Sequence, residues 1–107
     1  MSAIIRGTTP RIKYAFSSLD ARDITVALLK IKQEGQAIVE KELADADTVT
    51  AHSIEWVLSQ EDTLKLAPKK YAYISLDWLL DDDTRGAGVT EPVNVISSGT
   101  DEVLENV

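Results

Sequence analysis

The chain has 107 residues without a cysteine, and 18 acidic side chains stand against 11 basic ones, giving a formal net charge of -7. This length suits a single domain, and the lack of cysteine excludes disulfides, thiol catalysis and most structural zinc sites. The acidic balance argues against non-specific binding of nucleic acid, which needs clustered lysine and arginine to contact the phosphates. With 44% hydrophobic and 27% charged residues, the composition is that of a folded globular protein.

The N-terminal residues have neither the basic leader nor the apolar run of a secretory signal. The longest apolar stretches, such as 26–29, fall far short of the roughly 20 residues that span a bilayer. We therefore expect the chain to be made and folded in the cytoplasm, without a membrane partner.

Alternating apolar and polar residues predict a first strand over 11–16. Ile12, Tyr14 and Phe16 fall on one face of this strand, and Pro10 just before it suits a strand start. The mostly polar stretch 17–23 predicts a connection.

Residues 24–43 fit two different structures. β-branched residues on both sides of Gly35 favour a hairpin with strands over 24–33 and 37–43, because glycine tolerates the positive φ of a tight turn. The same stretch also contains good helix formers, and residues 24, 28 and 31 would share one helical face. We expect the hairpin and keep the helix as the alternative.

After a polar connection over 44–52, residues 53–58 predict another strand, with Ile54, Trp56 and Leu58 facing inward. Residues 59–62 then have the pattern of a capped helical turn, of the kind that bridges the two sheets of a sandwich.

Residues 71–80 have the most regular strand pattern, because every second position from Ala72 to Leu80 is apolar. We expect a turn over 81–88, which is rich in Asp, Thr and Gly. A last strand is expected over 89–96, in which Val89, Val93 and Val95 share a face and Pro92 indicates a sheet edge.

Together these elements predict an all-β domain over residues 1–96, an antiparallel sandwich or small barrel of about 6-8 strands. Residues 97–107 change in composition and contain Asp101, Glu102 and Glu105 without any basic residue. We expect this segment to be an acidic, disordered tail or a linker.

The run Asp81–Gly86 is a candidate metal site, since calcium prefers several carboxylates in a sharp turn. In the spacing of an EF-hand loop, however, Arg85 would occupy a ligand position and Pro92 would replace the final glutamate. A solvated hairpin tip is the better interpretation, and the pair Asp45 and Asp47 offers less still. We expect no metal and no cofactor.

His52 is the one histidine of the sequence, and neither a nucleophile motif nor a second histidine for metal binding accompanies it. Among 18 acids, some carboxylate pair at the spacing of a glycosidase is inevitable and carries no weight. The sequence offers no catalytic constellation, so we expect a protein without enzymatic activity.

The aromatic residues fall into two groups. Trp56 and Trp78 lie among in-phase apolar residues and are expected in the core. Tyr71 and Tyr73 instead share a face with Asp77, opposite the core row, where tyrosines can stack on a sugar ring or be buried by a partner. Cover by a loop or by the first strand is an equally good interpretation of the tyrosine pair.

One basic cluster, of Lys65, Lys69 and Lys70, stands out in the acidic sequence. We expect these lysines to solubilise a turn rather than to bind phosphate, so nucleic acid is not an expected partner.

Four segments occur in a recognisable order: residues 6–16 (RGTTPRIKYAF), 29–35 (LKIKQEG), 54–64 (IEWVLSQEDTL) and 76–82 (LDWLLDD). Together they resemble small phage and prophage proteins similar to the N-terminal domain of baseplate upper proteins of tailed phages that infect Gram-positive bacteria. The resemblance implies an immunoglobulin-like β-sandwich that serves as a structural adaptor in a tail or baseplate. Full baseplate upper proteins continue into further regions, so direct receptor binding is not implied, and the family offers no catalytic residues.

The resulting hypothesis is a non-enzymatic structural module of a virion, which assembles with other tail proteins or with copies of itself through sheet edges and exposed apolar side chains. The expected contact surfaces are the face that bears Tyr71 and Tyr73 and the edge that bears Val93 and Val95. The alternative is a carbohydrate-binding or cell-surface adhesion module. It would use the two tyrosines as a platform and Asp77 as an acceptor, or calcium bound at residues 81–86.

Overall fold

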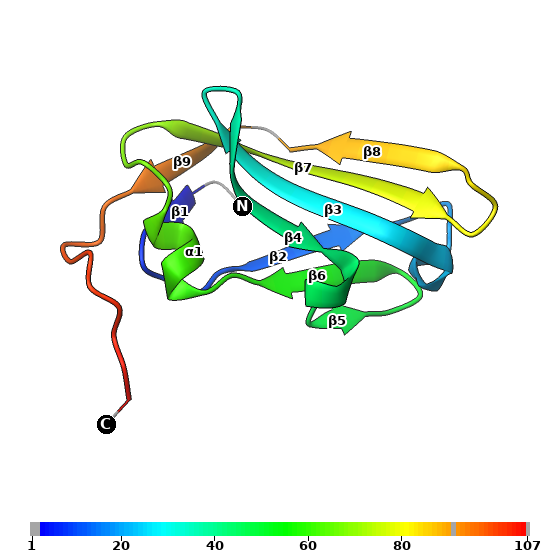
Figure 1. Ribbon diagram of the computed structural model, residues 1–107, viewed down its shortest axis with the longest axis horizontal. Helices are drawn as coiled ribbons and strands as arrows, with labels where there is room; N and C mark the ends of the chain where they lie inside the picture. Colours follow the sequence, from blue (N-terminus) through cyan, green and yellow to red (C-terminus); the bar gives the residue numbers. More distant parts are fainter. Residues whose placement is uncertain (1–2, 91, 107) are drawn as a thin grey trace.

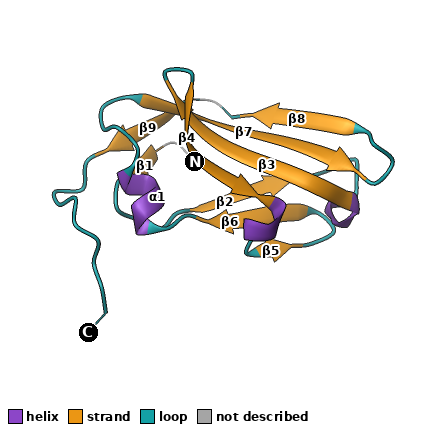
Figure 2. Cartoon of the chain, viewed as in Figure 1, coloured by secondary structure: helices purple, strands orange, loops and turns teal. Residues whose placement is uncertain are grey.

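The computed structural model describes residues 3–90 and 92–106, and it shows two β-sheets packed against each other (Figures 1 and 2). The larger sheet has the order β1–β9–β7–β3–β4, with β8 also paired to β7. Its strands are β1 (Ala3–Ile5), β3 (Ile24–Gln33), β4 (Gln36–Glu42), β7 (Tyr71–Leu80), β8 (Arg85–Val89) and β9 (Val93–Ile96).

The smaller sheet has the order β2–β6–β5 and consists of β2 (Arg11–Ala15), β6 (Ser53–Val57) and β5 (Thr48–Val49). Short helices lie in the connections: η1 (Ala21–Asp23), η2 (Leu43–Asp45) and α1 (Gln60–Leu64). Neighbouring strands are antiparallel except for the parallel pair of β1 and β9. The all-β sandwich fold expected from the sequence is confirmed, with nine strands in the described residues.

The hairpin predicted for residues 24–43 is confirmed, and the helix is wrong. Gln33 pairs with Gln36 across a two-residue turn in which both Glu34 and Gly35 have positive φ, the geometry that suits the twist of antiparallel strands. The register shifts beyond Ile31, which leaves Ile38 as an extra residue in β4. Because of this bulge, Val39 rather than Ile38 lies opposite Ile31 and is buried in the core.

The last predicted strand, over 89–96, is correct only in part, because residues 93–96 form β9 whereas Val89 ends a separate strand, β8. β8 pairs with β7 from Ser75 to Leu79, whereas β9 pairs with Tyr71 and Ala72 on the same edge of β7. The ladder is interrupted between them, where Pro92 has no backbone N–H to donate. The turn predicted over 81–88 is correspondingly shorter and spans 81–84.

β1 and β5 were not expected from the sequence. They have three and two residues, too few to show a period. β1 joins the sheet through a parallel register in which Ile4 lies beside Val95, and β5 lies within the stretch that the sequence indicates as a connection.

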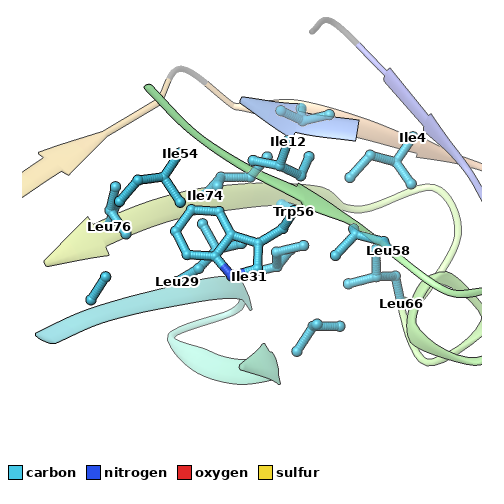
Figure 3. Packing of buried hydrophobic residues seen from close by; sticks show 14 of the residues in the cluster. Ile4, Ile12, Leu29, Ile31, Ile54, Trp56, Leu58, Leu66, Ile74 and Leu76 are labelled. Atoms are coloured by element: carbon cyan, nitrogen blue, oxygen red, sulfur yellow. The ribbon is translucent and has the colours of Figure 1, made fainter. Parts of the chain in front are cut away.

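The core lies between the two sheets and is centred on Trp56, whose side chain is 1% exposed (Figure 3). Its indole Nε1 donates a hydrogen bond of 3.0 Å to the Glu42 carbonyl, so the one polar atom of the ring is satisfied. Trp78, also expected in the core, is only partly buried. It packs edge-on against Phe16 with ring centroids 5.0 Å apart, and Tyr14 lies 5.6 Å away.

The helical turn predicted at residues 59–62 is confirmed as α1, which leads from the smaller sheet to β7 in the larger one (Figure 2). Ser59 Oγ accepts from the Asp62 N–H, and Asp62 Oδ2 accepts from the Ser59 N–H, both at 3.0 Å. Asp62 also pairs with Lys41 Nζ on β4 at 2.9 Å, so the helix start is tied to both layers.

Residues 97–106 leave the sandwich as a segment without helix or strand (Figure 1). Asp101 forms an ion pair with Arg6, and Gln60 bonds both backbone groups of Leu104. The domain boundary at residue 96 remains a prediction.

Candidate interaction surface

The outer face of the larger sheet, which points away from the smaller sheet, gathers most of the exposed large apolar side chains of the described residues. The described residues include nine exposed large apolar side chains. Six of the nine lie on the outer face: Ile5, Val26, Tyr71, Tyr73, Val89 and Ile96. An antiparallel sheet with one solvated face normally places polar residues on it. An apolar face of this kind is therefore the strongest candidate site in the molecule.

At one end of the outer face, the strand register brings polar groups beside the two tyrosines. Tyr71, 59% exposed, lies opposite Asn94 of β9, and Tyr73, 45% exposed, lies opposite Lys32 of β3. Directly opposed side chains have Cβ atoms about 5 Å apart, so these groups form one cluster. A shallow hollow of about 420 Å³ adjoins it, lined by Lys69, Asn94, Val95, Ile96 and Ser97.

The other end of the outer face is hollowed around Val26, which is 54% exposed. An open, mainly apolar hollow of about 240 Å³ is lined there by Val26, Leu28, Asp77, Trp78, Leu79 and Arg85. Asp77 belongs to this end, because its Oδ2 accepts a hydrogen bond of 2.7 Å from Arg85 Nη2. Along the strand Asp77 lies roughly 13 Å from Tyr73. The structure therefore does not place Asp77 beside the tyrosines, contrary to the expectation.

The prediction of a contact surface at a sheet edge that bears Val93 and Val95 is wrong. They are 1% and 3% exposed and belong to the core. β9 is also not a sheet edge, because β1 covers its outer side while β7 covers the other. The sequence signal for an edge, Pro92, marks the gap between β8 and β9 instead.

Charges on the outer face balance one another. Its outward positions on β3, β4, β7 and β8 include three cations and three carboxylates: Lys30, Lys32, Arg85, Glu40, Glu42 and Asp77. Two of the cations are paired, Arg85 with Asp77 and Lys30 with Glu40 at 3.9 Å. The face is thus neutral in a chain of net charge -7, and net repulsion does not oppose its burial.

Comparison of the chain with protein-family models, curated proteins and solved structures returned no match. In the part of the chain that the structure describes, no helix is both long and apolar enough to cross a membrane.

The acidic run Asp81–Gly86 forms the exposed tip of the β7–β8 hairpin and the start of β8. Asp82 Oδ1 accepts the Thr84 N–H at 2.9 Å, and this hydrogen bonding by Thr84 lowers the pKa of the Asp82 carboxyl. Arg85 points to Asp77 rather than into the tip. Within residues 3–90 and 92–106, no group of three His, Asp or Glu side chains is placed to hold a metal ion.

The remaining candidates have structural roles. Asp45 and Asp47 accept backbone N–H bonds from Glu42 at 2.9 Å and from Val57 at 2.6 Å. His52 is exposed, and its carbonyl accepts the Phe16 N–H at 2.7 Å.

The three lysines of the basic cluster have different environments in the structure. Lys70 pairs with Glu34 at 2.9 Å, and the Lys69 N–H bonds the Val95 carbonyl at 2.9 Å. Lys65 is the C-cap of α1.

The tyrosine pair is recognisable in the sequence, whereas Ile5, Val26, Asn94 and Ile96 are not. Their signal is weak, because an exposed apolar residue is recognised only when strand register shows which residues share its face. Val26 in particular is displaced by a register shift in β3 between Ile24 and Val26.

Proposed function

We propose that the chain is a non-enzymatic structural or adaptor module of a phage or prophage tail or baseplate, which works by protein–protein assembly in the virion. The observation that supports this is the apolar, charge-balanced outer face of the larger sheet. Burying such a face against a partner removes apolar area from water, which favours assembly.

The size of the face fits a stable contact. The six strands of the larger sheet contain 39 residues. At about 3.3 Å per residue and about 4.8 Å between strands, they give a face of roughly 600 Å². A specific protein–protein interface takes about 600–1,000 Å² from each partner. One partner seated on the outer face is therefore enough to hold the module in place.

Cross-linking of phage particles, purified from cells that carry the gene for the chain, tests the proposal. Lys30 and Lys32 lie on the outer face, whereas Lys13 lies on the exposed side of the smaller sheet. Amine-reactive cross-links that join Lys30 or Lys32 to other tail proteins are expected. Absence of the chain from the particles, or links through Lys13 alone, would contradict the proposal.

A matched pair of variants ties the contact to the apolar face. Tyr73 on the outer face and Val49 on the smaller sheet are similarly exposed, at 45% and 41%. We expect Tyr73→Ser to reduce incorporation into particles, whereas Val49→Ser leaves it unchanged. Equal incorporation of both variants would rule out the outer face as the contact.

A carbohydrate-binding or adhesion module is the second candidate, and the cluster of Tyr71, Tyr73, Asn94 and Lys32 favours it. The tyrosine rings offer apolar surface for a sugar ring, while the amide and ammonium groups offer hydrogen bonds to hydroxyls. A glycan array probed with the whole chain tests this. Binding that Tyr73→Ala abolishes supports the candidate, and a silent array removes it.

A further inference from the structure

The free edge of β8 lacks the protection that the edges of β4 and β2 have. Among the described strands, β8 pairs with β7 alone, so one side of Arg85–Val89 is open (Figure 1). Natural sheets guard such edges with charges, prolines or bulges. The outer edge of β4 has both a bulge at Ile38 and a run of charges at 40–42, and β2 carries Arg11 and Lys13. β8 has a single charge, at its first residue.

The hydrogen-bond phase shows which backbone groups of β8 point outward. The Leu80 N–H bonds the Thr84 carbonyl at 2.9 Å, and the Thr90 N–H bonds the Ile74 carbonyl at 2.8 Å. In an antiparallel ladder, hydrogen-bonded and non-hydrogen-bonded pairs alternate. Residues 86 and 88 therefore bond to β7, whereas the N–H and C=O groups of Arg85, Ala87 and Val89 point to the open side.

We propose that β8 pairs antiparallel with β8 of a second copy of the chain, about a two-fold axis at Ala87, so that the larger sheets of two copies become continuous. This inference rests on the proposed function and deepens it, because it names a second copy as one partner in assembly. The two-fold axis places Ala87 opposite Ala87 of the second copy and Arg85 opposite its Val89.

The sequence of β8 favours a second copy over an unrelated strand. Residues 85–89 read Arg-Gly-Ala-Gly-Val, so the pattern of small residues is symmetric about Ala87. The two-fold axis therefore matches glycine with glycine and alanine with alanine, which leaves no steric clash. A self-complementary patch of this kind is what a two-fold interface requires.

The proposed register also satisfies the polar and apolar groups of the edge. In β8, only the odd-numbered residues direct their backbone N–H and C=O groups to the open edge. The axis at Ala87 places odd-numbered residues of one copy opposite odd-numbered residues of the other, so each of these N–H groups meets a carbonyl. Val89 is 69% exposed, and it would lie against the aliphatic stem of Arg85 from the second copy. No like charges face each other, because Arg85 meets Val89.

Sedimentation of the whole chain over a wide concentration range tests the pairing, with two variants of one residue. Val89→Lys places an ammonium opposite Arg85 of the second copy, whereas Val89→Glu places a carboxylate there. Both remove the same apolar side chain. We expect a concentration-dependent dimer for the natural chain, and a dissociation constant at least about tenfold higher for Val89→Lys than for Val89→Glu, since the contact occurs twice. Equal constants for the two variants would overturn the register.

A disulfide provides a second readout. Opposed Cα atoms in a hydrogen-bonded antiparallel pair lie about 5.5 Å apart, within the range of a disulfide. Because the chain has no cysteine, Ala87→Cys is expected to give a covalent dimer on mild oxidation, whereas Val26→Cys, exposed but away from the edge, is not. Equal cross-linking of both variants, or a natural chain that stays monomeric, would overturn the inference. Loss of the dimer leaves the cross-links of Lys30 and Lys32 to tail proteins intact, so the two proposals fail separately.

Discussion

The indole ring of Trp78 lies directly over the backbone of Gly86, and a Cβ atom added to Gly86 would overlap the ring. Next along β8, the ring of Tyr14 occupies the corresponding space above Gly88. The strand has glycine at these two positions because the aromatic rings between the sheets leave no room for a side chain there. The chain uses glycine as a packing residue at these positions.

Gly86→Ala is expected to destabilise the fold by about 1–3 kcal/mol, the usual effect of forcing extra volume into a packed site. Trp78 cannot easily yield, because it is packed edge-on against Phe16. The free energy of unfolding in urea measures the effect. In a Trp78→Leu background the same glycine substitution should cost clearly less, and an unchanged cost would show that the ring is not the cause.

Gln33 bonds both backbone groups of Ala67 with its side-chain amide, and it is 5% exposed. Its Nε2 donates to the Ala67 carbonyl at 2.9 Å, and its Oε1 accepts from the Ala67 N–H at 2.8 Å. Gln33→Met keeps the approximate volume but leaves both Ala67 groups without a partner, so we expect a loss of about 1–3 kcal/mol in urea unfolding. Lys32→Met next to it, which removes no such bond, serves as the control and should cost much less.

Arg6 contributes to stability mainly by bonding backbone carbonyls. Its guanidinium donates at 2.8 Å to both the Leu64 and Leu66 carbonyls, while its ion pair with Asp101 is largely exposed on the aspartate side. Arg6→Met should therefore cost about 1–3 kcal/mol, and Asp101→Asn less than about 1 kcal/mol. Thermal unfolding compares them. A larger effect from Asp101→Asn would show that the ion pair is the main contribution.

Asp62 is expected to make the fold sensitive to acid. Burial raises the pKa of its carboxyl, but the hydrogen bond from the Ser59 N–H and the contact with Lys41 outweigh this, and the pKa lies below its ordinary value of 3.8. A lowered pKa in the folded state adds stability above the unfolded pKa, and this contribution is lost as the pH falls through the folded value.

The Asp62→Asn variant tests this acid sensitivity. The natural chain should lose more unfolding free energy than Asp62→Asn when the pH falls from neutral to below about 4. Parallel stability curves for the two proteins would mean that another carboxylate is responsible. Asp20 provides a contrast: hydrogen bonds with Arg22 hold its pKa at about 2, but Arg22 is only two residues away and 66% exposed. Such a local, solvent-screened pair adds little to folding, so Asp20→Asn should change the pH profile less than Asp62→Asn does.

The strands that could be predicted are those whose two faces differ. In β7 and β2, apolar and polar residues alternate because one face is buried, and the pattern is visible in the sequence. β8 could not be predicted, since Gly86 and Gly88 look like turn residues until the rings that cover them are known. β1 was missed for a different reason: its position depends on pairing with a strand about ninety residues away.

The candidate surface was predictable only in part. The tyrosines were found because they alternate against a clear core row, but the partners beside them, Asn94 and Lys32, lie on other strands. Val93 and Val95 show the opposite error. Their alternation indicated a strand correctly, but only the unexpected β1 shows that this strand is covered on both sides.

The parallel pairing of β1 with β9 also constrains how the chain can fold during synthesis. The β3–β4 hairpin needs only neighbouring residues and can form as soon as they leave the ribosome. Ile4, however, is buried beside Val95, so its place in the core exists only after β9 has been translated. Throughout synthesis the first strand therefore remains an unpaired apolar segment, and completion of the larger sheet is a late, long-range step.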